Sequence, residues 1–273
     1  FDITSADDSF HSNASMAIAG GTITVASGDD GFHADETLYI SGGDITVTES
    51  YEGLEGEVVE ITGGNINVTA SDDGINAAGG NDESGFGGAF GDRFGGSSDS
   101  AIKISGGTIY VDAGGDGVDS NGDIYISGGE IYVSGATNGG DSALDYDGTA
   151  TITGGTFVAT GYSGMAQNFG SNSTQGSILV NLSSTTTKEV KITDESGNVL
   201  ASYTPAKNYN SVVISAAGLK KGGTYTLTAG GTTTSITLTS LIYGEGMGGG
   251  QGGNPGGTGG NPGGFGGGPG GRR

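Results

Sequence analysis

The sequence contains no cysteine and no tryptophan among its 273 residues. Without cysteine, the chain cannot build a disulfide framework, a thiolate-ligated zinc site or a cysteine nucleophile. Basic residues are also scarce, because only nine lysines and arginines stand against 31 aspartates and glutamates, for a net charge of −22. Such a charge repels nucleic-acid phosphates and anionic membranes, so we expect neither as a partner.

Long hydrophobic runs are missing as well. Apolar residues make up 33% of the chain, and no stretch approaches the roughly 18 consecutive apolar residues that a membrane-spanning helix requires. We therefore expect no membrane insertion. The chain begins at Phe1, as a secreted protein does after removal of its signal peptide, although a recombinant chain begins the same way. We expect an extracellular location.

Glycine is abundant, with 61 residues, and a Gly-Gly pair recurs at steps of 22, 21, 43, 22 and 26 residues. The pairs begin at Gly20, Gly42, Gly63, Gly106, Gly128 and Gly154. An alternating apolar and polar segment precedes and follows each pair, which is typical of strands with one buried face. The sequence therefore predicts an all-β protein, a right-handed parallel β-helix with coils of about 22 residues.

We divide the chain into three parts. Residues 1–176 form the β-helix, with an insertion at 79–99; residues 177–243 form a small antiparallel β unit with a hairpin turn at 195–198; and residues 244–273 form a Gly/Pro-rich tail. The insertion carries Phe86, Phe90 and Phe94, and is either a flexible loop or a loop whose aromatics cover a binding face. The tail is either disordered or packed as polyproline-II-like strands.

A short acidic segment recurs between the two strands of each coil. Because coils stack at about 4.8 Å, these acids fall into columns whose carboxylates repel one another, and a divalent cation removes that repulsion. Oxygen ligands without cysteine select Ca²⁺ over zinc or copper; the alternative is a set of solvated acidic turns. The predicted calcium ligands are Asp29, Asp30, Asp72, Asp73, Asn76, Asp116, Asp119, Asn121, Asp145 and Asp147. His11 and His33 are predicted to stack as imidazoles in the same corner.

Three segments carry a resemblance to a known family: 115–122 (Gly-Asp-Gly-Val-Asp-Ser-Asn-Gly), 145–148 (Asp-Tyr-Asp-Gly) and 164–167 (Gly-Met-Ala-Gln). Set among Ile-Ser-Gly-Gly-x-Ile strands, they resemble the bacterial cell-surface carbohydrate-binding domain with a calcium-binding, pectate-lyase-like β-helix, and the resemblance covers residues 1–243. It implies several calcium ions and binding of cellulose or acidic plant polysaccharides such as polygalacturonate. The Asp-Asp-x-x-Asp motif of related lyases is only partial here, since His33 and Asn76 stand at its last position.

Three functions follow from these features. The first is a carbohydrate-binding module with Tyr110, Tyr132 and Tyr125 as platforms for sugar rings, unless these tyrosines are plain strand surface. The second is a polysaccharide lyase with Lys103 or Arg93 as base; Lys103 lies on the strand before a Gly-Gly pair, away from the acidic corners, so we expect no enzyme. The third is a self-assembling extracellular fibre subunit, a homopolymer formed by end-to-end stacking.

Overall fold

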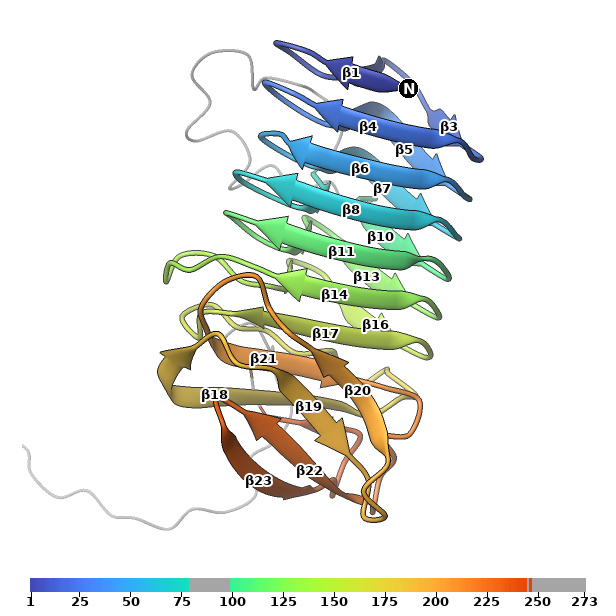
Figure 1. Ribbon diagram of the computed structural model, residues 1–273. Coiled ribbons are helices and arrows are strands. Elements are labelled where there is room, and N and C mark those ends of the chain that lie inside the picture. Colours follow the sequence, from blue (N-terminus) through green and yellow to red (C-terminus); the bar gives the residue numbers. More distant parts are fainter. Residues whose placement is uncertain (79–98, 245, 247–273) are drawn as a thin grey trace, which may run out of the picture.

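The computed structural model describes residues 1–78, 99–244 and 246. These residues form strands labelled β1 to β24 and no helix, so the described chain contains no helix that could span a membrane. About six coils of a parallel β-solenoid lie on top of one another, and strands of the C-terminal part follow below them (Figure 1). The predicted all-β fold is confirmed.

The first sheet is the long face of the solenoid. Successive coils add one parallel strand each, and the chain winds as a right-handed coil as it descends from β1 to β17 (Figure 1). In spatial order its strands are β1 (Asp2–Thr4), β4 (Thr22–Ala26), β6 (Asp44–Glu49), β8 (Asn65–Ala70), β11 (Thr108–Ala113), β14 (Glu130–Ser134), β17 (Thr156–Gly161), β21 (Tyr209–Ser215), β18 (Ser177–Thr186) and β24 (Ile242–Tyr243).

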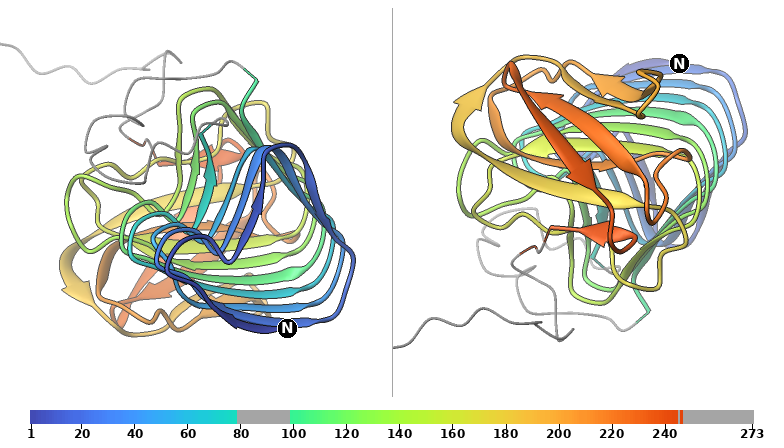
Figure 2. Two further views of the ribbon diagram at one scale, coloured as in Figure 1. Left: turned by 90° about the horizontal axis from the view of Figure 1, so that it is seen from above. Right: turned by 90° about the horizontal axis from the view of Figure 1, so that it is seen from below.

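The second sheet forms the remaining sides of each coil. Its two long strands, β5 and β7, run through both of these sides, whereas other coils use two shorter strands. Seen from above, the coils lie over one another around a common interior (Figure 2). The strands are β2 (Phe10–Ser12), β3 (Met16–Ile18), β5 (Phe32–Ile40), β7 (Leu54–Ile61), β9 (Ile75–Ala77), β10 (Ala101–Ile104), β12 (Val118–Ser120), β13 (Asp123–Ile126), β15 (Asp145–Tyr146) and β16 (Ala150–Ile152).

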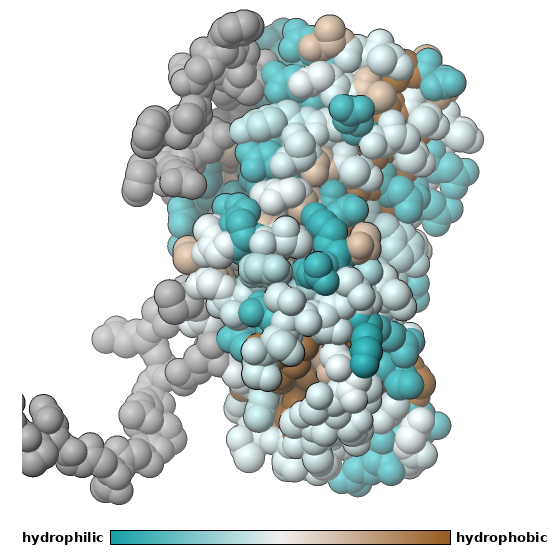
Figure 3. Space-filling view, turned by 60° about the vertical axis from the view of Figure 1, so that its left-hand side comes forward, coloured by the Kyte–Doolittle hydropathy of each residue, from teal (hydrophilic) through white to brown (hydrophobic). Residues whose placement is uncertain are grey.

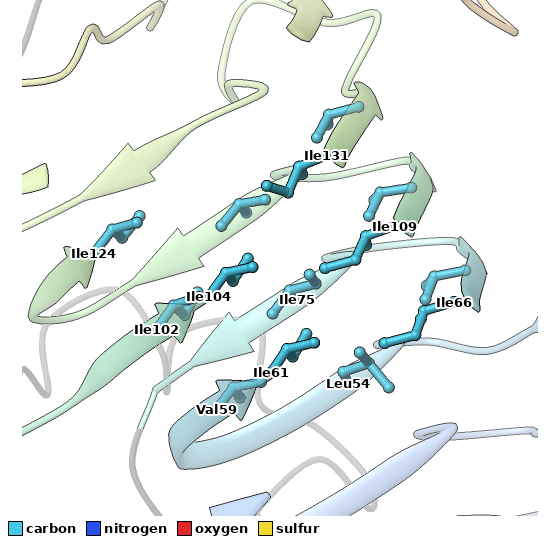
Figure 4. Close-up of a cluster of buried hydrophobic side chains, with 14 of the residues drawn as sticks. Leu54, Val59, Ile61, Ile66, Ile75, Ile102, Ile104, Ile109, Ile124 and Ile131 are labelled. Atoms are coloured by element: carbon cyan, nitrogen blue, oxygen red, sulfur yellow. The ribbon is translucent and has the colours of Figure 1, made fainter. Parts of the chain in front are cut away.

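Aliphatic ladders fill the interior between these sheets. Alternation along each strand points every second residue inward, and parallel register places like residues above one another. Figure 4 shows isoleucines from successive coils converging on the interior. Burial of each contributes about 1.5–3 kcal/mol, so a sparsely apolar chain still builds a continuous core. One ladder, exposed by no more than 5%, contains Ile23, Ile45, Ile66, Ile109, Ile131 and Phe157.

The Gly-Gly pairs form one corner of every coil. The second glycine of each pair has a φ between +84° and +113°, a region that other residues adopt only with strain. The pair therefore makes the sharp turn from the second sheet into the first. These positive-φ glycines are Gly21, Gly43, Gly64, Gly107, Gly129 and Gly155.

The 43-residue step between two Gly-Gly pairs contains one coil and an insertion, as the sequence predicts. Strand β8 pairs directly with β11, and Lys103 of β10 pairs with Glu60 of β7. Both sheets therefore keep their register past the insertion. The predictions for the aromatic loop at 79–98, and for the tail apart from Gly244 and Gly246, lie outside the described residues.

The chain after residue 176 forms antiparallel strands, as predicted, but it is joined to the solenoid. Strand β21 pairs antiparallel with β17, and β18 then pairs with β21, so both extend the first sheet. The third sheet is built from β19 (Val190–Thr193), β20 (Val199–Tyr203), β22 (Thr224–Ala229) and β23 (Thr232–Thr237). Its predicted hairpin turn contains Gly197 at a φ of +83°. Seen from below, the C-terminal strands lie across the lower end of the solenoid (Figure 2).

Candidate functional site

The acidic segments stack into two ladders at the corner where the first sheet leads into the second. We call this corner, with both its ladders, the acidic corner. The inner ladder contains Asp8, Asp30, Glu52, Asp73 and Asp116. Three residues further along each coil, the outer ladder contains His11, His33, Glu55, Asn76, Asp119 and Asp145, paired in parallel register from coil to coil.

Carboxylates of the inner ladder accept hydrogen bonds from the backbone of the next coil. The amide of Asp30 donates to Asp8 Oδ1 at 3.0 Å, and the amide of Glu52 donates to Asp30 Oδ1 at 3.2 Å. Lower down, the amide of Asp116 donates to Asp73 Oδ1 at 2.6 Å, and the amide of Ser142 donates to Asp116 Oδ1. A carboxylate in this position therefore fixes the spacing of two adjacent coils, because it satisfies a buried donor.

Glycine follows the inner acid in several coils because the coils approach one another closely there. A Cβ added to Gly74 would lie 2.1 Å from Val111 Cγ1 and 2.7 Å from the carbonyl oxygen of Gly117. A Cβ on Gly53 would lie 2.2 Å from Val68 Cγ1. Steric crowding between neighbouring coils is therefore the reason that glycine occupies these positions.

The two histidines stack in the outer ladder, as predicted, with ring centroids 4.8 Å apart and planes 5° from parallel. His11 Nδ1 lies 2.7 Å from Asp8 Oδ2. His33 is fully buried, and its ring nitrogens contact carboxylates of Asp30, Asp35 and Glu55. Burial lowers the pKa of His33, but the hydrogen bonds to Asp30 and Glu55 outweigh it and raise the pKa to about 11. A charged imidazolium therefore balances carboxylates in the upper coils.

Below His33, burial and mutual repulsion raise the pKa of several carboxyl groups. Glu52 is 5% exposed, and burial, followed by repulsion from Glu55, Asp30 and Asp73, raises its pKa well above the usual range. Burial raises the pKa of Glu55 to about 8, with the hydrogen bond to His33 opposing the shift. Burial and the carboxylate of Asp119 raise the pKa of Asp116 to about 8. These groups favour either a proton or a bound cation.

In the lower coils, three predicted ligands converge. Carboxylate oxygens of Asp116, Asp119 and Asp145 lie within 4.8 Å of one another. Gln167, from the next coil, donates through Nε2 to Asp145 Oδ1, while its Oε1 atom is buried and has no hydrogen-bond partner.

A second buried amide oxygen without a hydrogen-bond partner occurs one coil above Asp119. Asn76 is 2% exposed, and its Nδ2 donates to Glu52 Oε2 at 2.8 Å, yet Oδ1 has no partner. A buried oxygen without a donor costs about 1–3 kcal/mol. Both amides therefore offer the acidic corner a lone pair that a hard cation would satisfy.

Four of the other predicted ligands lie outside the group formed by Asp116, Asp119 and Asp145. Asp29 groups with Asp7 and Asp8 at the top of the corner. The oxygens of Asp72 lie beside Gly115, where an added Cβ would be 2.3 Å from Oδ1. Asn121 donates through Nδ2 to the carbonyl of Ala78 at 3.2 Å. Asp147 belongs to no such group in the described part of the chain.

The calcium ligands predicted from the sequence do not include several members of the acidic corner. Asp8, Glu52 and Glu55 join groups of potential ligands, and Gln167 extends the outer ladder by one coil. The signal that identifies the first three is their phase, since each occupies the position of a predicted ligand one or two coils away. Gln167 stands 22 residues after Asp145, which is one regular coil length, so the same phase identifies it.

The three predicted tyrosines lie on two different faces. Tyr110 and Tyr132 stack on the outer side of the first sheet with ring centroids 5.0 Å apart, and Tyr203 continues the stack at 5.4 Å from Tyr132. Tyr125 lies on the second sheet, where its hydroxyl donates to Asp123 Oδ2 at 2.5 Å. Lys103 is in register with Glu60 and Tyr125 on that sheet, away from the acidic corner; Arg93 lies outside the described residues.

One side of the outer surface offers few hydrophobic patches. Figure 3 shows one side of the molecule, on which hydrophilic and intermediate residues predominate and hydrophobic ones form small areas. Large apolar surfaces of the kind that protein partners cover are therefore not a feature of this side.

A search of curated proteins found no match, and neither did a search of solved structures. A family model described as "Carbohydrate-binding domain-containing protein" matches residues 30–242. This match covers more than half of the chain, including most of the solenoid, most of the acidic corner and all three predicted tyrosines. The family indicates a binding role rather than a catalytic one. The chain belongs to this family of carbohydrate-binding domain-containing proteins, in the form of a parallel β-solenoid.

Proposed function

We propose that this protein is an extracellular carbohydrate-binding protein whose solenoid is stabilised by Ca²⁺ in the acidic corner. One observation carries the calcium part of the proposal. The carboxylates of Asp116, Asp119 and Asp145 converge beside the buried, unpartnered amide oxygen of Gln167. Calcium takes six to eight oxygen ligands, mixes carboxylates with amide oxygens and tolerates irregular geometry.

The donor set favours calcium over other metals. The corner offers carboxylate and amide oxygens, whereas zinc and copper prefer thiolate and imidazole. The two histidines lie at the upper end of the corner and already contact carboxylates. A bound ion would satisfy the orphaned oxygens, remove the repulsion between ionised carboxylates and connect adjacent coils. Its role in this proposal is to hold the fold.

An extracellular location accords with this chemistry. Extracellular calcium modules work with dissociation constants of about 10⁻⁴–10⁻³ M. The polysaccharide ligand is cellulose or an acidic plant polysaccharide. For an acidic chain, calcium would also have to bridge carboxylates of protein and glycan, because a protein of net charge −22 otherwise repels a polyanion.

The test has two independent measurements on the purified chain. Metal content after dialysis against calcium, determined by mass spectrometry, should show bound Ca²⁺, and removal by chelator should lower the unfolding temperature until calcium is restored. Depletion of the protein by insoluble cellulose, and calorimetry with polygalacturonate in calcium, should show glycan binding. A chain that is metal-free after dialysis and equally stable in chelator contradicts the calcium part; absence of any glycan binding contradicts the carbohydrate part.

The fibre function remains a separate proposal. Strand β1 pairs with β4 on one side only within the described chain, and an open strand edge can pair with another molecule. Electron microscopy with and without chelator distinguishes filaments from single solenoids.

A further inference from the structure

A groove lies where the C-terminal part overhangs the outer side of the first sheet. It has a volume of about 550 Å³ and is formed by three successive strands, β6, β8 and β11, together with the segment that follows β20. Thr46, Asn67 and Tyr110 lie in one register column along its floor. Tyr203 and Ala206 close one end. The groove therefore lies beside the tyrosine stack, with Tyr110 and Tyr203 both in its lining.

Along this register column, large aromatic side chains are followed by a smaller side chain. Tyr203, Tyr132 and Tyr110 stack in sequence, and the planes of the last two differ by 17°. The next coil contributes Asn67 in place of a fourth ring. Since adjacent strands are about 4.8 Å apart, Asn67 leaves a space above it about as thick as one ring. Tyr110 is 43% exposed and borders that space.

The end of the groove is fixed before any ligand binds. Ser134 Oγ lies 2.8 Å from the hydroxyl of Tyr203 and accepts a hydrogen bond of 3.0 Å from the amide of Ala206. Lys207 pairs with Asp112 at 2.8 Å and donates to the carbonyl of Ala113. These contacts connect the overhanging segment to the first sheet. A rigid groove loses little entropy on binding, which favours affinity.

The chemistry of the groove suits an uncharged sugar. Its one carboxylate, Asp112, is paired with Lys207. The other polar side chains of the lining are uncharged, with an amide from Asn67 and hydroxyls from threonines and tyrosines. Such groups exchange hydrogen bonds with sugar hydroxyls, while a pyranose ring presents an apolar face to an aromatic ring. A polyanion would enter against the negative charge of the whole protein.

We propose that a neutral polysaccharide binds in this groove, with one pyranose ring stacked on the free face of Tyr110 above Asn67. The sugar ring takes the place of a fourth member of the tyrosine stack. This assignment rests on the carbohydrate-binding function proposed above, and it names the site and the charge class of the glycan. It separates Tyr110 and Tyr132 from Tyr125, which lies on the other sheet and takes no part.

Calorimetry with cellohexaose and with hexagalacturonate, both in calcium, tests the assignment on four forms of the full chain. Tyr110→Ala removes the platform and should weaken cellohexaose binding by about tenfold or more. Asn67→Tyr removes one amide from the site and fills the space beside Tyr110 with a ring. It should abolish cellohexaose binding without lowering the unfolding temperature. Tyr125→Ala is the matched control, because Tyr125 is 42% exposed, and should bind as the unchanged chain does.

Each other result has a defined meaning. If the unchanged chain binds cellohexaose and neither Tyr110→Ala nor Asn67→Tyr alters affinity, the groove assignment is wrong while the carbohydrate function stands. An equal loss in Tyr125→Ala also overturns the assignment. Hexagalacturonate bound as tightly as cellohexaose, with the same dependence on Tyr110, overturns the choice of a neutral glycan. If the unchanged chain binds no glycan, neither these two nor insoluble cellulose and polygalacturonate, the proposed function itself fails.

Discussion

The backbone amide of Asp116 donates a hydrogen bond of 2.6 Å to Oδ1 of Asp73, its counterpart one coil earlier. The carboxylate thus acts on the backbone of the neighbouring coil as well as on its own surroundings. An acid at this position has two roles, since it can accept a backbone hydrogen bond and offer its other oxygen to a cation. The predictions below separate these roles.

Asp116→Asn separates charge from hydrogen bonding, because asparagine Oδ1 still accepts from the amide of Ser142. Without calcium, we expect the variant to be at least as stable as the unchanged chain, since repulsion with Asp119 and Asp145 is relieved. Calcium should stabilise the variant less than it stabilises the unchanged chain, and the variant's calcium affinity should be lower by at least about tenfold. Calorimetric titration with calcium and thermal unfolding measure both effects. Glu130→Gln, an exposed change outside the acidic corner, should leave both unchanged.

The calcium-free protein should become less stable as the pH rises. The pKa of Glu55 is about 8 in the folded protein against 4.5 normally, and that of Asp116 is about 8 against 3.8. The folded state therefore keeps protons that the unfolded state releases. The stability that is present below about pH 4 is lost progressively up to about pH 8. His33 adds to the loss above its normal pKa of 6.5, because its folded pKa is about 11.

Urea unfolding of protein stripped of metal on a chelating resin, at about pH 5 and about pH 9, measures this dependence. Saturating calcium should flatten it, because the ion favours the ionised carboxylates at every pH. A midpoint that rises with pH in the metal-free protein would contradict the assigned protonation.

His33→Gln should destabilise the chain far more than His11→Gln. His33 is fully buried among three carboxylates, so its removal leaves buried charges without their cation, at a cost of about 3–5 kcal/mol. His11 occupies the same register position one coil above, but it is partly exposed and, besides its stacking on His33, pairs with the single carboxylate of Asp8, so its loss should cost under about 1 kcal/mol. Chemical denaturation of the two variants gives the difference, and equal losses would show that His33 is not the balancing cation.

Gly74→Ala should disrupt the contact between two coils. The added methyl group would lie 2.1 Å from Val111 Cγ1 and close to a backbone oxygen, so we expect a loss of about 1–3 kcal/mol. Gly20→Ala provides the control, because nothing lies within 4 Å of its added Cβ; it should be neutral or slightly stabilising. Thermal unfolding distinguishes them. A neutral Gly74→Ala would show that the coils can separate locally without cost.

The repeating part of the fold could be predicted because the same residue pattern recurs in successive coils. The Gly-Gly pairs locate one corner, and alternation around Ile45 or Ile109 locates the strands on either side. The acidic corner followed from phase alone, which is why Asp116, Asp119 and Asp145 were recognised together. The predicted calcium itself, like the predicted end-to-end assembly, stays a prediction.

The remainder depends on contacts between segments that are distant in sequence. Tyr203 joins Tyr132 across about seventy residues, and nothing in the local sequence around Tyr203 marks it as part of that stack. Likewise, β21 pairs with β17 through Val158 and Ile214, although the sequence places β17 in the β-helix and β21 in a separate antiparallel unit. Antiparallel pairing after the last coil has no repeat to fix its register.

The coil that contains the insertion has a practical consequence. Ile102 of β10 keeps its partners Val59 and Ile124, although the chain between β9 and β10 is longer here than in any other described coil. The junction between Ala77 and Ala101 thus tolerates added length without disturbing the strands above and below it. A foreign peptide spliced in at this junction should be displayed from the side of the rod, so that this solenoid becomes a carrier as well as a binder.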